Sequence, residues 1–101
     1  MQRRRVEIDV DALVITEGKA GYIGARGISV DDVFELLAHA PRFFVLLDPE
    51  SGEEEYSMLG QTSGGRFLLV AIEKSEEEGA WRLISAYPLN ARRGQRLYEG
   101  S

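Results

Sequence analysis

The chain has 101 residues, 44% of them hydrophobic, and 17 acidic against 12 basic side chains give it a formal net charge of −5. This length predicts a single domain spanning residues 1–101 with one modest core. No window approaches the roughly 18 uninterrupted apolar residues of a membrane span, and residues 3–5 are three arginines with no apolar signal core behind them. We therefore expect a soluble, unexported protein that does not associate with membranes.

The chain contains no cysteine, and His39 is its one histidine. These counts exclude disulfides and thiolate metal sites, and they leave no imidazole cluster for zinc. We therefore expect neither a metal nor a cofactor. The lack of cysteine fits a reducing cytoplasm, which is the expected compartment.

Three elements are predicted in the first part of the chain. Residues 6–11 alternate between apolar and polar, which predicts a half-buried strand with a possible extension to Ile15. Glycines at every third position from Gly18 to Gly27 predict a weak helix or an irregular turn. Ser29 is a typical N-cap for a second helix, which Pro41 ends near residue 40.

The remainder of the chain predicts a meander followed by a helix. Short apolar runs at residues 43–47, 55–59, 66–72 and 81–85 predict four strands, and the hairpin-length links between them contain glycine. Asn90 predicts the cap of a last helix that continues through Leu97 or Tyr98 and is weakened by Gly94. The expected fold is α+β, with an antiparallel sheet packed against helices.

Charge is distributed unevenly along the chain. Two acidic runs flank predicted turns, and we expect them to be solvated loop faces rather than calcium sites; the runs are Glu50, Glu53, Glu54 and Glu55, then Glu73, Glu76, Glu77 and Glu78. Residues 82–99 carry four arginines and a single glutamate. A positive segment in an acidic protein predicts a docking place for an anion or an acidic partner.

The order of residues from Arg82 resembles one protein family. Arg82-Leu83-Ile84-Ser85-Ala86 followed by a basic helix that ends in Tyr98-Glu99 resembles the BrnT-like branch of the RelE/ParE toxin superfamily of bacterial toxin–antitoxin systems. The similarity covers nearly everything after Thr16. It also includes Glu17, Ile23, Gly27, Ile28-Ser29, Gly60 and the stretch from Gly65 to Val70.

This resemblance implies a fold, an activity and partners. The fold would be RelE-like, with a four-stranded meander plus an N-terminal strand, two helices before the meander and one after it. The activity would be metal-independent endoribonuclease cleavage of mRNA by a type II toxin. The partners would be RNA and a cognate antitoxin, often a ribbon-helix-helix protein.

The resemblance also implies site residues. Arginines would hold the scissile phosphate, while a base and an acid exchange protons with the ribose and the leaving oxygen. The implied catalytic residues are Arg82, Tyr87, Tyr98 and Glu17. The implied RNA-binding residues are Lys19, Arg26, Arg92, Arg93 and Arg96.

Several polar positions depart from the family pattern. Glu55 and Tyr87 stand where the family has arginines, and Tyr22 and Arg26 stand where it has a histidine pair. Whether catalysis survives the changes at Glu55 and Tyr87 is therefore open. Arg82 could bind phosphate or pair with Glu73 across the sheet.

Other interpretations of the same residues also stay open. Tyr87 could donate a proton or pack against Pro88. The arginines of the last helix could track RNA or complement the helix C-terminus.

A second functional hypothesis is a catalytically inactive binding module that engages a protein partner. The acidic balance favours it, because RNA-binding domains are commonly basic. An exposed strand at Phe43 and Phe44, or an edge at residues 6–10, could support a homodimer.

Overall fold

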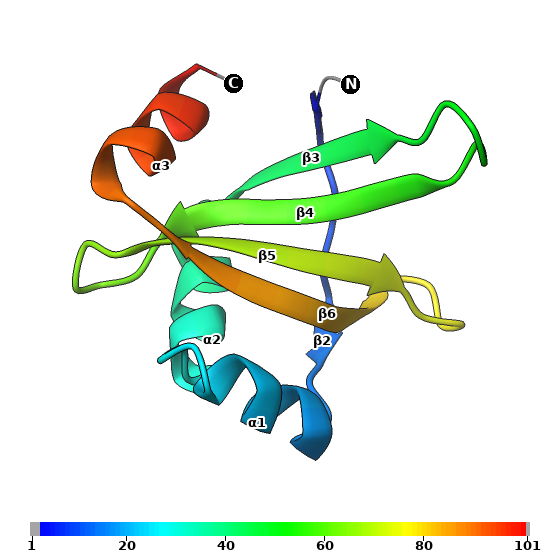
Figure 1. Ribbon diagram of the computed structural model, residues 1–101. Coiled ribbons are helices and arrows are strands. Elements are labelled where there is room, and N and C mark those ends of the chain that lie inside the picture. The colour runs from blue at the N-terminus through cyan, green and yellow to red at the C-terminus, as the bar shows by residue number, and fades with distance from the viewer. Residues whose placement is uncertain (1–2, 101) are drawn as a thin grey trace.

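The computed structural model describes residues 3–100, which form a six-stranded sheet and three helices. Figure 1 shows α1 and α2 together on one side of the sheet and α3 on the other. In chain order the elements are β1 (Arg4–Val6), β2 (Ala12–Val14), α1 (Glu17–Gly24), α2 (Val30–Ala38), β3 (Arg42–Leu47), β4 (Glu54–Gln61), β5 (Phe67–Lys74), β6 (Ala80–Leu89) and α3 (Ala91–Glu99). The predicted α+β class is confirmed.

The predicted antiparallel meander is also confirmed. The strand order is β1-β3-β4-β5-β6-β2, in which β3 to β6 pair in sequence order through hairpins. Strand β6 contains a bulge, because Ala71 pairs with Ser85 while Ile72 pairs with Leu83, which leaves Ile84 as the extra residue.

The predicted N-terminal strand is wrong in extent. Instead of one strand over residues 6–11, β1 pairs antiparallel with β3 at one edge of the sheet, and β2 pairs parallel with β6 at the other edge. The segment between them crosses the sheet, as the blue chain shows in Figure 1. Ile8 and Val10 pack on the core while their polar neighbours face solvent. A half-buried segment has this alternation whether or not it pairs with a strand, so the pattern predicted burial but not pairing.

The hairpin between β5 and β6 fixes the end of this crossing segment. The carbonyl of Gly79 accepts hydrogen bonds from the amides of Asp11 (2.8 Å) and Ala12 (3.2 Å). Gly79 has a φ of +81°, and a Cβ at this position would collide with the Asp11 carboxylate. Glycine therefore permits both the turn and the contact.

Local signals explain the first two helices. Thr16 caps α1 through its side chain, which accepts from the Lys19 amide, so the glycine-rich segment is a helix rather than an irregular turn. Ser29 and Asp32 form a reciprocal capping box at the start of α2. Helix α2 ends at Ala38 with His39 at its C-cap, in agreement with the predicted stop before Pro41.

The main core lies between the helices α1 and α2 and one face of the sheet, called the first face below. Ile23, Val33 and Leu36 of the helices are completely buried against this face. Trp81 and Leu83 of β6 belong to the same cluster. Its other members are Leu13, Ile28, Met58, Leu68, Val70, Ile72 and Ala86.

Helix α3 covers one end of the opposite, second face. Gly94 lies directly on Phe67, because a Cβ added there would overlap the root of the phenylalanine side chain. The glycine that weakens the helix in isolation thus allows α3 to approach β5 closely. Phe67 is buried, and Phe43 and Phe44 face opposite sides of β3, with Phe44 buried on the second face. None of the helices within residues 3–100 is long and apolar enough to cross a membrane.

Candidate functional site

The second face, beneath and beside α3, is built from three rows of side chains. Strand register sets Arg42, Leu59, Leu69 and Tyr87 in one row, Phe44, Ser57, Ala71 and Ser85 in the next, and Leu46 with Glu55 and Glu73 with Arg82 in the third. Small residues dominate the middle row. The face is therefore hollowed between α3 and the strand ends.

The first of three neighbouring hollows lies beside α3 and is called the α3 hollow. It has a volume of about 800 Å³, and its floor is apolar. Four arginines line it, namely Arg3, Arg4, Arg5 and Arg96, together with Phe44, Leu46, Leu59, Leu69, Leu97 and Gly100. A cationic rim around an apolar floor suits a ligand that carries both negative charge and flat apolar groups.

The second hollow occupies the middle of the face and is called the central hollow. Its volume is about 230 Å³. It is lined by Arg3, Leu46, Glu55, Tyr56, Ser57, Leu69, Ala71, Ser85 and Tyr87. It shares Arg3, Leu46 and Leu69 with the α3 hollow, so the two are continuous.

The third hollow lies between α1 and the exposed edge of β6 and is called the α1 hollow. Its volume is about 410 Å³. Its lining consists of Thr16, Gly18, Lys19, Tyr22, Ile84, Ser85 and Tyr87. Ser85 and Tyr87 belong to the central hollow as well, so the three hollows form one surface with cations at both ends. We call this surface the cationic face.

Arg26 holds the α1 end of this face together. Its guanidinium lies 4.4 Å from the ring centre of Tyr22 and 4.3 Å from that of Tyr87. It also donates hydrogen bonds to the Tyr22 hydroxyl (2.6 Å) and to the Ala86 carbonyl (3.0 Å). Two tyrosines, 46% and 43% exposed, are thereby fixed next to a permanent positive charge.

Tyr87 is the most chemically distinctive residue of the face. The Ser85 hydroxyl, and after it the Arg26 guanidinium, lowers the pKa of the Tyr87 phenol below its usual value. Both neighbours favour the phenolate by hydrogen bonding, and Arg26 adds the effect of its charge. A phenol with a lowered pKa is a better proton donor near neutral pH than an ordinary tyrosine.

Of the implied site residues, Lys19, Arg26 and Tyr87 come together at the α1 hollow. Glu17 is the exposed first residue of α1. Its neighbours Thr16 and Gly18 both line that hollow. Tyr87 is far from the other three in sequence, and the packing of α1 on β6 brings it close to them.

Arg82 lies in the third row, where its Nε is 3.4 Å from a carboxylate oxygen of Glu73. About half of each side chain is exposed, at 50% and 53%. This is the cross-strand pair that the sequence left as an alternative to phosphate binding. Exposed pairs of this kind are weak, so Glu73 holds Arg82 only loosely.

Tyr98 makes its contacts away from the α1 hollow. Its hydroxyl donates to the Ala40 carbonyl at 2.8 Å, and the Arg42 guanidinium lies 4.4 Å from its ring centre. Its ring also lies 6.4 Å from that of Phe67. These contacts attach α3 to the start of β3.

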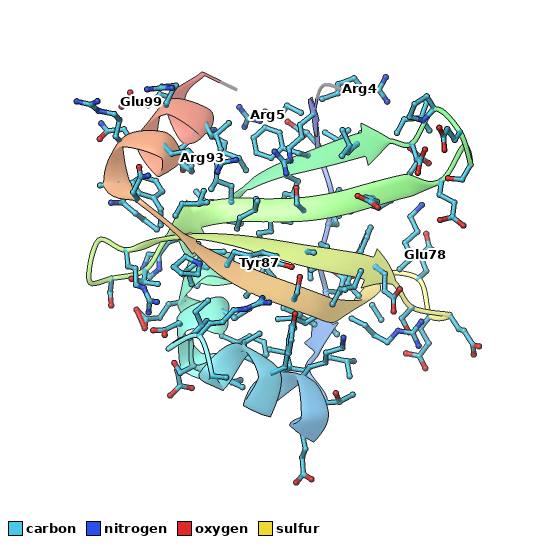
Figure 2. The ribbon with its side chains drawn as sticks, in the orientation of Figure 1. Arg4, Arg5, Glu78, Tyr87, Arg93 and Glu99 are labelled. Carbon is cyan, nitrogen blue, oxygen red and sulfur yellow. The ribbon has the colours of Figure 1, made fainter. Side chains whose placement is uncertain are left out.

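The arginines of α3 divide into two groups. Arg96 lines the α3 hollow, whereas Arg92 and Arg93 are exposed in the first turn of the helix. Figure 2 shows Arg5 and Arg93 at the α3 end of the molecule and Glu78 at the opposite end of the strands.

Sequence reasoning missed the arginines at residues 3–5 and the small residues of the middle row. From the sequence alone the three arginines served only as evidence against a signal sequence. Charged side chains are, however, typical of the edge strand of a sheet, where they form a charged rim. Ser57 and Ala71 gave no signal at all. Their role depends on the register between β4 and β5, which no local pattern specifies.

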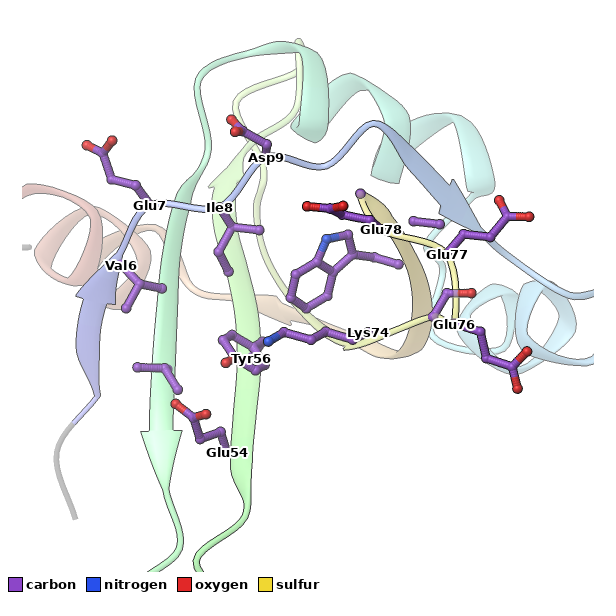
Figure 3. A pocket seen from close by; sticks show the side chains of 15 residues that line it. Val6, Glu7, Ile8, Asp9, Glu54, Tyr56, Lys74, Glu76, Glu77 and Glu78 are labelled. Carbon is purple, nitrogen blue, oxygen red and sulfur yellow. The ribbon is translucent and has the colours of Figure 1, made fainter.

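A fourth hollow, the acidic hollow, lies on the first face at the other end of the strands (Figure 3). Its volume is about 540 Å³, and its wall includes the edge-to-face pair Tyr56 and Trp81, with ring centres 5.2 Å apart. Lys74 is the cation in its lining and lies 5.3 Å from the Tyr56 ring centre. The acidic residues are Glu7, Asp9, Glu54, Glu76, Glu77 and Glu78.

The described residues contain no group of three or more histidine, cysteine or acidic side chains arranged to hold a metal ion. Comparison with known proteins gave no further guide to the site. No family model matches the chain, and no curated protein matches it.

Proposed function

We propose that this protein binds single-stranded RNA along its cationic face and cleaves it, as a metal-independent endoribonuclease of a type II toxin–antitoxin system whose antitoxin covers the same face. The observation that carries the proposal is the continuity of the three hollows, which places four arginines at one end and Lys19, Arg26 and two tyrosines at the other. The family resemblance that begins at Arg82 supports it.

The composition of the face suits single-stranded nucleic acid. Cations along a groove bind the phosphates, and exposed aromatic rings stack on bases with about 1–3 kcal/mol for each base. Tyr22 and Tyr87 are exposed rings whose orientation Arg26 fixes. A fixed ring loses little conformational entropy when a base stacks on it.

Tyr87 and Glu17 are the proposed acid and base. Glu17 accepts the proton of the ribose 2′-hydroxyl, and the 2′-oxygen attacks the phosphorus. The bond to the 5′-oxygen breaks, and Tyr87 gives that oxygen its proton, which leaves a 2′,3′-cyclic phosphate. Arg26 remains charged beside Tyr87 throughout and stabilises the phenolate that forms.

The test is mapped cleavage of an mRNA in a cell-free translation reaction by the wild type and by Tyr87→Phe. The variant keeps the ring and its contact with Arg26 but loses the proton, so we expect cleavage to fall by about 10²- to 10⁴-fold with RNA binding retained. Equal cleavage by both proteins would refute the role of Tyr87. No cleavage by either would refute the endoribonuclease.

The pH dependence provides a second readout. An acid must be protonated to donate, so wild-type cleavage falls as the pH rises through the pKa of Tyr87. Because that pKa is lowered, the fall occurs below the value near 10 of an ordinary tyrosine. The residual cleavage by Tyr87→Phe should lack this alkaline fall.

A non-catalytic binding module remains the second candidate, and one observation favours it. Arg82 is paired with Glu73, and Arg26 already makes two hydrogen bonds, so the arginine on the same strand as Tyr87 and the arginine that touches its ring both have protein partners. Binding of RNA or an acidic peptide without any cleavage would decide for this candidate.

A further inference from the structure

The central hollow contains a carboxylate that phosphate binding does not explain. Glu55 lines it together with Arg3, and within residues 3–100 the Glu55 side chain has no hydrogen-bond or ion-pair partner. A carboxylate repels phosphate and weakens the cationic face for a polyanion. Its position instead suits a ligand group that donates hydrogen bonds.

The geometry of the hollow suits one nucleoside. Glu55 on β4 and Tyr87 on β6 both line it on either side of β5, with two strand spacings, about 10 Å, between their strands and four residues, roughly 13 Å, between their rows. Between them lie Ser57, Ala71 and Ser85, whose small side chains leave the floor low. A nucleoside that stacks on Tyr87 can direct the edge of its base at Glu55.

The chemistry of the carboxylate selects among the bases. Two carboxylate oxygens accept two parallel N–H bonds. Guanine has two adjacent donors on its Watson–Crick edge, at N1 and at the 2-amino group. Adenine and cytosine place a donor beside an acceptor there, and uracil has one donor between two acceptors, so each leaves one carboxylate oxygen without a partner.

We propose that Glu55 reads a guanine base in the central hollow, which makes the bound RNA guanine-specific at one position. This inference rests on the proposed RNA binding and adds its sequence preference. Arg3, at the same hollow, is placed to hold a phosphate of that nucleotide. The residue that creates this preference, Glu55, stands where the family pattern has an arginine.

The first experiment measures binding of fluorescent hexauridylates that carry one central guanosine, inosine or adenosine. We expect wild type to prefer guanosine over adenosine by about 5- to 150-fold, with inosine in between because it lacks the 2-amino group. Glu55→Gln should lose this preference and favour adenosine, since an amide both accepts from N6 and donates to N1. Glu54→Gln is the matched control, because this neighbour lines the acidic hollow on the opposite face.

Outcomes separate the inference from the proposed function. The guanine site would be overturned if every oligonucleotide bound in a salt-dependent way with no base preference. It would also be overturned if Glu55→Gln kept the preference. Either result would leave RNA binding intact. A second experiment titrates ¹⁵N-labelled protein with 5′-guanylate and 5′-adenylate. Shifts at Ser57 and Ala71 with guanylate alone support the site, and equal or absent shifts overturn it whatever the oligonucleotides do.

Discussion

The cationic face and the acidic hollow lie on opposite faces of the same sheet, and both combine aromatic rings with charge of a single dominant sign. The cationic face has Tyr22 and Tyr87 among arginines, and the acidic hollow has Tyr56 and Trp81 among carboxylates. The net charge of −5 is a sum over the whole chain and hides the difference between these two regions. An acidic chain can therefore present a surface for a polyanion, because the local field and not the total charge governs docking.

The two regions also differ in how their cations are held. In the acidic hollow, Lys74 is surrounded by carboxylates and lies over Tyr56, so it has partners of opposite charge nearby. Within residues 3–100, the lining of the α3 hollow contains no carboxylate, and its four arginines gather like charges beside an apolar floor, which raises the local positive potential. An incoming phosphate chain relieves that mutual repulsion.

The largest effect on RNA binding that distinguishes the two regions should come from the double variant Arg3→Ser and Arg96→Ser, which removes two cations from the cationic face. Each arginine should contribute about tenfold to RNA affinity, so the double variant loses roughly a hundredfold. The slope of log affinity against log salt should fall by about 1.4 for single-stranded RNA. Fluorescence anisotropy at several salt concentrations measures both quantities.

Lys74→Ser is the control for that double variant. It removes a positive charge from the acidic hollow, and we expect the salt slope to stay at the wild-type value. A slope that falls equally in both proteins would show that net charge, and not the cationic face, controls binding.

A smaller effect is expected from Gly94→Ala. The added methyl group overlaps Phe67, and overpacking of this kind costs about 1–3 kcal/mol, of which the better helix propensity of alanine offsets about 1 kcal/mol. We expect a lower melting temperature and weaker RNA binding, because α3 moves and carries Arg96 with it. NMR shifts should be confined to α3 and β5; changes centred on residues 76–79 would contradict the packing described.

Glu73→Gln should strengthen RNA binding slightly. It releases Arg82 from an exposed pair worth at most about 1 kcal/mol, so affinity should rise by less than about fivefold. Unchanged affinity would show that Arg82 takes no part in binding, and a fall would show that its pairing with Glu73 helps binding. Glu76→Gln, in the hairpin at the acidic end, serves as the charge-matched comparison.

The smallest effect concerns a contact outside both regions. Hydrogen bonds from the Ser63 hydroxyl and amide lower the pKa of Glu35, which joins α2 to the β4–β5 turn. A lowered pKa stabilises the fold above the ordinary glutamate pKa of about 4.3, and the contribution disappears as the pH falls below it. Glu35→Gln should flatten the stability profile in that acid range and leave RNA binding unchanged at neutral pH.

Much of the fold was predictable because its signals are local. The Ser29 cap, the stop before Pro41 and the glycine-containing hairpins each act within a few residues, and the meander and α2 follow from them. The course of residues 7–11 was not predictable, since an alternating segment can pair with a strand or cross a sheet with the same pattern.

The candidate site was predictable only in part. Basic residues near the chain end pointed to an anion, and the resemblance named Tyr87, Lys19 and Arg26. Sequence could not show that Arg3 shares a hollow with Glu55 and Tyr87, because that contact depends on pairing between β1 and β3 and on the register of three more strands.

The most direct test of the account is to find which face RNA contacts. A ¹⁵N-resolved NMR titration with hexauridylate follows backbone amides on both faces at once. We expect shifts at Gly18, Tyr22 and Leu97, which line the two ends of the cationic face, with Ser75, Glu77 and Gly79 beside the acidic hollow unchanged. Shifts confined to the latter group, or no shifts at low salt, would contradict RNA binding on the cationic face.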